Sequence, residues 1–209
     1  MKHRLMLQVL VLSLMFIFGI SSASALGLGT YYNLGWGDGE IEYDDHHYGD
    51  VDIDTDHRGR AIGFVLDTNV AKNALFNYRL NVALDTIDFG HGLEADGYVM
   101  DHTFGFGVLR NKYVRLWIGP QINLAYYTDD IKFRDNNIHY KTDFDAFGIG
   151  VGPAMGVNIH AGDFISFTAT TGYKYMFLFG DFVDDFTGYE GQYYINFGML
   201  FRINDVYKN

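Results

Sequence analysis

Residues 76–86 read Phe-Asn-Tyr-Arg-Leu-Asn-Val-Ala-Leu-Asp-Thr, with an apolar side chain at nearly every even position. Successive side chains of a β-strand point to opposite faces, so this stretch has one apolar and one polar face. Tyr78 and Leu80 lie on the apolar face. The polar face carries Arg79 and Asp85, which a strand inside a soluble core would rarely bury. The pattern is typical of a transmembrane β-strand between lipid and a polar lumen.

The same alternation recurs along the rest of the chain. The connections between these segments alternate between short turns and longer polar stretches. This alternation is typical of outer-membrane barrels, whose short turns face the periplasm. Two of the longer connections, residues 38–57 and 128–143, are expected to be loops. The sequence therefore predicts an all-β fold, an eight-stranded antiparallel up-and-down transmembrane β-barrel. Its strands are expected near 26–37, 58–70, 76–88, 98–110, 113–127, 144–159, 164–179 and 190–203.

Residues 1–25 have the three parts of a cleavable signal peptide. Lys2 and Arg4 are basic, an apolar run continues to Ile20, and Ala23-Ser24-Ala25 is a small-residue cleavage site. A retained anchor helix is the alternative, but the apolar run is short for one. We expect export from the cytoplasm and a barrel domain over residues 26–209.

Charge and composition exclude several classes of function. Without Lys2 and Arg4, 13 of the 15 basic residues remain against 26 acidic ones, a net charge of −13. Such a surface suits nucleic acid poorly. The absence of cysteine excludes disulfides and thiolate ligands. We expect no nucleic-acid partner, no cofactor, and a monomer.

Extending the alternation through all eight strands places charged side chains inside the barrel. A narrow lumen cannot leave buried charges unpaired, so we expect a salt-bridge network that fills it. A charged pore lining is the alternative, but eight strands leave little more room than side chains occupy. The predicted polar network consists of Asp67, Arg79, Asp85, Asp101, Arg115, Lys174 and Arg202, with Glu190 near the outer rim.

The stretch Asn196-Phe197-Gly198-Met199-Leu200-Phe201-Arg202-Ile203 runs polar, x, Gly, x, x, apolar, x, apolar. It resembles the signal that outer-membrane barrels present to the barrel-assembly machinery, although six residues follow Ile203 where most bacterial members end in an aromatic residue. With the strand pattern, the chain resembles the small eight-stranded outer-membrane barrel families of the OmpA membrane domain, OmpX and OmpW. The resemblance implies an integral protein of a Gram-negative outer membrane, surrounded by lipid and lipopolysaccharide, with surface loops that carry any specificity.

The segment 38–57 is strongly acidic and contains no lysine or arginine. A calcium loop is not matched, because His57 stands where glycine is required and Gly63 where the bidentate glutamate should be. In an extended strand three aspartates would share one face and could hold a divalent cation weakly; the alternative is a solvated, self-repelling loop. Arg58 and Arg60 follow, where they could meet lipopolysaccharide phosphates. The three aspartates are Asp52, Asp54 and Asp56.

Pro120 and Pro153 interrupt neighbouring predicted strands at similar depth. Proline cannot donate to a β-ladder, so both are unusual inside a closed barrel. One hypothesis is a lateral seam that admits a small apolar molecule, which resembles the proline-marked gaps of the lipid A palmitoyltransferase barrel and the apolar channel of the OmpW family. The alternative is a pair of β-bulges, with glycines of the second strand making room for Trp117 and Tyr127.

An enzymatic role has little support in the sequence. Ser166 is the one serine after residue 25 and falls near a predicted periplasmic turn, away from the outer leaflet. His102 is expected near the outer rim, but Asp101, His102 and Thr103 are consecutive and alternate faces. We expect no enzyme; a lipid-modifying barrel is the third alternative. The leading expectation is a structural and surface-interaction barrel, followed by a narrow channel for small apolar solutes.

Overall fold

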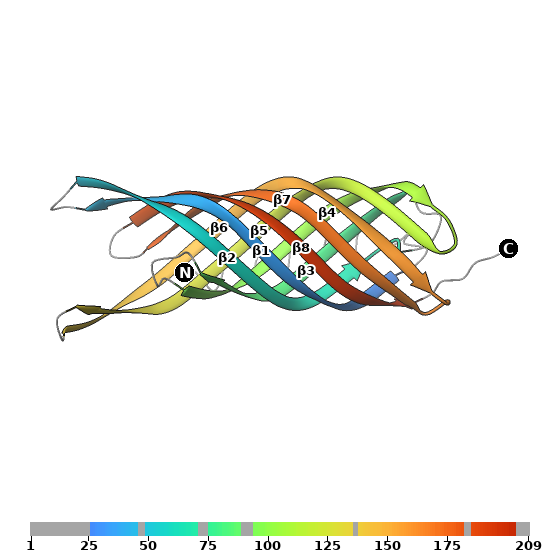
Figure 1. Cartoon of the computed structure of the whole chain (residues 1–209), viewed down its shortest axis with the longest axis horizontal. Helices are drawn as coiled ribbons and strands as arrows, with labels where there is room; N and C mark the ends of the chain where they lie inside the picture. The colour runs from blue at the N-terminus through green and yellow to red at the C-terminus, as the bar shows by residue number, and fades with distance from the viewer. Residues whose placement is uncertain are drawn as a thin grey trace.

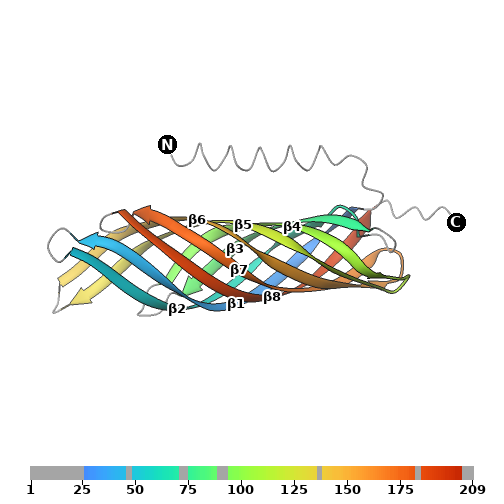
Figure 2. The ribbon, with the colours of Figure 1, turned by 90° about the horizontal axis from the view of Figure 1, so that it is seen from above.

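The structure is a computed structural model that describes residues 26–45, 49–70, 75–88, 94–135, 138–181 and 185–203. Each strand is antiparallel to the next and β8 pairs with β1, so one sheet closes into a barrel (Figures 1 and 2). The predicted fold class is confirmed, whereas the predicted signal peptide lies outside the described residues. The strands are β1 (Leu26–Asp45), β2 (Gly49–Asp67), β3 (Phe76–Asp88), β4 (Glu94–Arg110), β5 (Val114–Asp135), β6 (Ile138–Ala161), β7 (Ile165–Asp181) and β8 (Asp185–Ile203).

The strands are longer than predicted at one end of the barrel. The expected loops at 38–57 and 128–143 are wrong, because β1 and β2 stay paired as far as Asp45 and Gly49, and β5 and β6 as far as Asp135 and Ile138. Figure 1 shows these two hairpins projecting beyond the other strands. The apolar alternation stops where the lipid ends, but antiparallel hydrogen bonding needs no apolar face and continues.

Tight turns connect β4 to β5 and β6 to β7 at the other end, as predicted. In the β4–β5 turn, the Asn111 side-chain oxygen accepts hydrogen bonds from the backbone N–H groups of Tyr113 and Val114, both at 2.9 Å. The β6–β7 turn contains Gly162 with a φ of 70°, a conformation that glycine adopts without strain. In outer-membrane barrels the short turns face the periplasm, so we call this end the periplasmic end and the end with the long hairpins the extracellular end. The described residues include no helix long and apolar enough to span a membrane.

The outer surface of the barrel carries an apolar belt. On β1 the outward side chains are apolar or aromatic as far as Trp36 except for Thr30, and Asp38 follows; on β4 the change falls between Tyr98 and Asp96. Two residues depart from the expected exposure: Tyr78 and Leu80 are buried, and the Tyr78 ring lies 5.5 Å from that of Phe104. Exposed members of the belt include Tyr32, Leu34, Ile62, Phe64, Leu84, Phe106, Ile118, Ile149, Phe167, Phe177, Phe197 and Phe201.

Glycines on the inner face make room for large side chains. A Cβ on Gly156 would lie 2.4 Å from Trp117 Cζ2, so this glycine of β6 accommodates the indole, as one alternative predicted. A Cβ on Gly97 would lie 2.5 Å from Tyr127 Cδ1. The glycine that makes space for Tyr127 therefore lies on β4, whereas that alternative places such glycines on β6.

Candidate functional site

Arg79 crosses the lumen near its periplasmic end. Its guanidinium forms a salt bridge of 2.9 Å with Asp67 and lies 4.9 Å from the centre of the Trp117 ring. Only 2% of Arg79 is exposed, and every polar contact it makes crosses to another strand. Its acceptors are Asp67 on β2, Asn158 on β6, and Thr168 and Thr170 on β7, at 2.8–3.2 Å.

Arg115 joins this periplasmic cluster through an asparagine. Its guanidinium donates to Asn77 Oδ1 at 3.0 Å, and Asn77 donates to Asp67 Oδ2 at 3.2 Å. Arg115 also donates to the backbone carbonyl of Asn69 at 3.1 Å. Three predicted network residues, Asp67, Arg79 and Arg115, are thus brought together in one cluster that spans the bore.

A second cluster lies in the extracellular half of the lumen. Lys174 Nζ lies 3.7 Å from Asp101 Oδ1 and 5.4 Å from the centre of the Tyr194 ring. Asn123 donates to the same Asp101 oxygen at 2.6 Å. Asp101 is therefore contacted from β5, its neighbour in the sheet, and from β7, which lies two strands further round the barrel.

Two further pairs lie in the extracellular half. Tyr127 donates its hydroxyl to Asp85 Oδ2 at 3.0 Å. His57 Nε2 lies 2.8 Å from Glu190 Oε1, and both side chains are almost fully buried. Asp101 and Glu190 are each close enough to Asp85 to repel it, while Lys174 attracts it.

All seven predicted network residues are buried, each at most 5% exposed. Arg202 donates to the Gly162 carbonyl at the periplasmic turn. Several polar partners of these charges were not predicted from the sequence. The alternation predicts which side chains point into the lumen. It does not predict which strands face each other across the bore. The missed partners are His57, Asn77, Asn158, Thr168 and Thr170.

Pro120 and Pro153 are directly opposite each other on a continuous β5–β6 ladder. The ladders on their far sides are interrupted instead, at the same depth. The register is unchanged on either side of each gap, so the prolines do not form β-bulges; the described register shift lies between Gly107 and Leu109 on β4. The β4–β5 gap spans 104–105 and 119–120, and the β6–β7 gap spans 152–153 and 173–174.

An apolar groove of about 1080 Å³ surrounds the two prolines on the outer surface. Gln121 and Ala154 also line it, although both are buried residues on the inner face. The groove therefore reaches into the wall where the two ladders are interrupted. Its outward-facing walls include Ile118, Ile122, Val151, Met155, Tyr173 and Tyr193.

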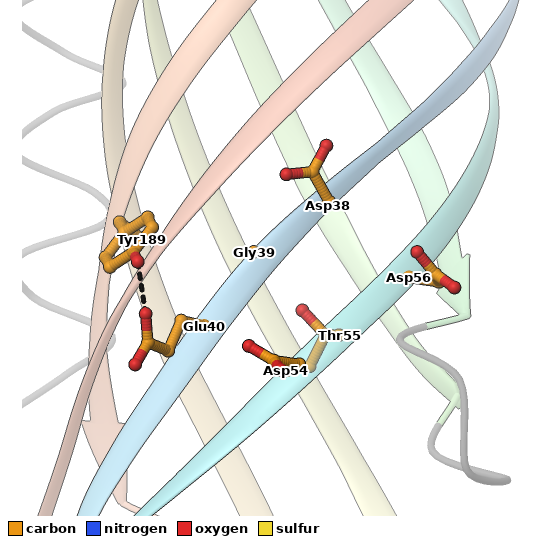
Figure 3. Close-up of a pocket in the computed structure, with 7 residues that line it drawn as sticks. All are labelled: Asp38, Gly39, Glu40, Asp54, Thr55, Asp56 and Tyr189. Carbon is orange, nitrogen blue, oxygen red and sulfur yellow. Dashed lines mark hydrogen bonds between the residues drawn. The ribbon is translucent and has the colours of Figure 1, made fainter.

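A second hollow of about 550 Å³ lies on the acidic surface above the belt (Figure 3). Asp38 is paired opposite Asp56 and Glu40 opposite Asp54, so like charges face each other across the β1–β2 ladder. Tyr189 donates its hydroxyl to Glu40, and this bond raises the pKa of Tyr189 to about 12. The tyrosine therefore remains a protonated donor at neutral pH.

The predicted weak cation site falls on this surface only in part. Asp54 and Asp56 are exposed on the outer face of β2, whereas the side chain of Asp52 lies outside the described residues. Among the side chains that are described, no group of three or more His, Cys, Asp or Glu could hold a metal ion. Arg58 and Arg60 are exposed on the same face, just above the belt. The cation site stays a prediction.

The residues considered for catalysis do not converge. Asp101 and Thr103 are buried on the lumen face, whereas His102 lies on the outward face midway along β4, not near the outer rim, and contacts the Tyr78 hydroxyl at 2.6 Å. Ser166 is buried near the periplasmic turn, with its Oγ 2.8 Å from His160 Nδ1. This serine–histidine contact was not predicted.

Comparison with known proteins supports the fold. No protein-family model and no curated protein matches the chain. Among solved structures, the outer membrane protein OprG from Pseudomonas aeruginosa matches with a TM-score of 0.53 and 11% identity, over 87% of this chain and 96% of that one. The outer membrane protease OmpT from Escherichia coli follows at 0.43 and 8% identity, over 87% and 98%. Ail, the attachment invasion locus protein of Yersinia pestis, matches with a TM-score of 0.34 and 12% identity, over 85% of this chain and 99% of that one.

The closed ring of eight strands, buried charges and an apolar outer belt define a transmembrane β-barrel. The likeness to OprG shows the same fold. The chain is therefore a small outer-membrane β-barrel, located in the bacterial outer membrane as its sequence predicted.

Proposed function

We propose that this chain is a structural and surface-interaction barrel of a Gram-negative outer membrane, exported by residues 1–25 and without enzymatic activity. The observation that carries the proposal is Arg79, whose bonds to three other strands cross the bore near its periplasmic end. A lumen filled in this way supports a scaffold rather than an open pore.

The extracellular surface supplies the interactions of this scaffold. Arg58 and Arg60 are exposed just above the belt, where lipopolysaccharide phosphates would lie, and the acidic β1–β2 hairpin projects beyond them. The last strand, which carries the assembly-type signal, is the one that closes on β1. We therefore expect the barrel-assembly machinery to insert the chain and lipopolysaccharide to surround it.

Conductance measurements test the filled lumen. In planar lipid bilayers the wild-type barrel is expected to give no sustained single-channel openings. Arg79→Ala is expected to produce openings, because it removes the side chain that crosses the bore. Steady conductance by the wild-type protein would contradict the proposal.

A second function is favoured by the groove at the prolines: a narrow channel for small apolar solutes with a lateral opening near Pro120 and Pro153. An apolar groove and two interrupted ladders coincide at one depth. Separation of β6 from β7 there would break fewer hydrogen bonds than elsewhere along the same pair.

A disulfide across the β6–β7 gap tests this opening in a chain without native cysteine. Oxidised Pro153→Cys/Tyr173→Cys is expected to lower entry of toluene into proteoliposomes to the protein-free rate. Ile149→Cys/Phe177→Cys is the control, since these exposed residues pair where the same two strands are continuous. Equal entry with both locked pairs, or no entry in the wild type, would contradict the channel.

A further inference from the structure

The extracellular half of the lumen holds more acidic than basic side chains. Its described side chains include Asp85, Asp101 and Glu190 against Lys174, with His57 beside Glu190. Each of these five is at least 95% buried. An uncompensated charge in such a place is costly, so this half of the bore is suited to an additional cation.

Most of the buried polar atoms in this half that have no described hydrogen-bond partner are acceptors. Asp85 Oδ1, Glu190 Oε2, Asn81 Oδ1 and Asn123 Oδ1 have no donor among the described residues. The orientation of the Asn123 amide is fixed, because its nitrogen donates to Asp101. Asn81 lies directly opposite Asp101 and on the same face of β3 as Asp85. Buried acceptors normally have donors, so these oxygens favour a ligand that brings N–H groups.

Lys174 shows which chemistry this bore accommodates. Its ammonium lies near the Asp101 carboxylate and over the Tyr194 ring, a combination of ion pairing and cation–π attraction. Asp85 offers a carboxylate beside Tyr127 in the same half; Lys174 attracts this carboxylate, but its Oδ1 has no hydrogen-bond donor among the described residues. A second ammonium group fits there better than a carboxylate, which three acidic neighbours would repel.

The proline groove meets the lumen wall at Gln121. Gln121 lines the groove and also accepts a hydrogen bond from Tyr194 inside the lumen. Asn123 is the next inward-facing residue along β5, and Lys174 lies in the interrupted part of the β6–β7 ladder. An elongated ligand could thus keep an apolar part in the groove and a polar head in the lumen.

We propose that this half of the lumen binds the ammonium group of an amphiphilic primary amine, with Asp85 and Glu190 as its charge partners. The apolar body of the amine extends towards the groove at Pro120 and Pro153. The inference deepens the second proposed function, the channel for small apolar solutes, by naming the class of solute. An ammonium group carries three N–H donors, which would hydrogen-bond to the unpartnered oxygens. A neutral solute without such donors would leave these oxygens without hydrogen bonds.

The test compares n-hexylamine with n-hexanol, which has a similar chain and no charge. Binding is followed by amide NMR of the isotope-labelled full barrel in phosphatidylcholine nanodiscs. The variant is Asp85→Asn/Glu190→Gln, which keeps side-chain shape. The control is Asp88→Asn/Glu94→Gln, a directly paired and exposed Asp and Glu on the outer face.

The wild type is expected to show saturable shifts around Asn81, Asp101 and Asn123 with n-hexylamine, at a Kd about tenfold below that of n-hexanol. Asp85→Asn/Glu190→Gln is expected to remove that preference, and the control to retain it. Equal affinity for both probes in the wild type, with shifts confined to the groove, would contradict the proposed amine site. The channel proposal would remain intact. No saturable shift with either probe would overturn the amine too, because water would then satisfy the acceptors; the disulfide experiment would still decide the channel.

Discussion

Replacing Arg79 with alanine is expected to lower the free energy of unfolding by about 3–5 kcal/mol, because the change leaves Asp67 buried without its cation. Asn158, Thr168 and Thr170 lose their donor at the same time. Urea titration of the barrel refolded in detergent micelles, followed by tryptophan fluorescence, measures the difference. Trp117 is a suitable reporter, since its ring lies against the Arg79 guanidinium.

Arg60→Ala is the matched control for this result. Arg60 is the same residue type, on the outward face of β2, and it is exposed. Its removal is expected to change stability by less than about 0.5 kcal/mol. Similar effects of the two substitutions would mean that the Arg79 cluster does not hold the strands together across the bore.

The substitution Ile122→Arg is expected to cost about 2–4 kcal/mol, the range for an arginine on the lipid face near the bilayer midplane. Ile122 is exposed on the outward face of β5, between Leu116 near the periplasmic end and Tyr126 at the outer end of the belt. The penalty arises because lipid cannot hydrate the guanidinium. Unfolding titrations in phospholipid vesicles, rather than in micelles, measure it.

Thr128→Arg provides the control on the same strand and the same face. Thr128 is exposed just beyond Tyr126, so its substitution places the charge above the belt. An effect of at most about 1 kcal/mol is expected. If Ile122→Arg cost no more than Thr128→Arg, the outer face at Ile122 would not be in contact with lipid.

The fold could be predicted because the bilayer imposes a strict two-residue period on each strand. That period by itself assigns Asp67, Arg79 and Lys174 to the lumen and Phe64, Ile118 and Phe197 to the lipid, and the barrel buries the first three and exposes the others. The two-residue period does not predict where the strands end on the extracellular side. Beyond Trp36 the outer face meets water, so residues up to Asp45 lose their apolar signal while keeping their ladder.

The contacts within the lumen were less accessible to prediction. Arg79 reaches Thr168 across 89 residues of sequence, and the tilt and stagger of eight strands decide that meeting. The same limit applies to the prolines. The sequence shows that the two prolines lie at similar depth. Only the strand register shows that they are directly opposite each other and that the interrupted ladders lie on their far sides.

The most direct test of the central claim, an outer-membrane barrel with lipid outside and charges inside, is fractionation of the full chain expressed in a Gram-negative host. Membrane separation on a sucrose gradient is combined with electrophoresis of unboiled and boiled samples. We expect recovery in the outer-membrane fraction and a heat-dependent change in mobility, because a closed barrel resists detergent until boiled. A monomer that remains soluble without detergent would contradict it.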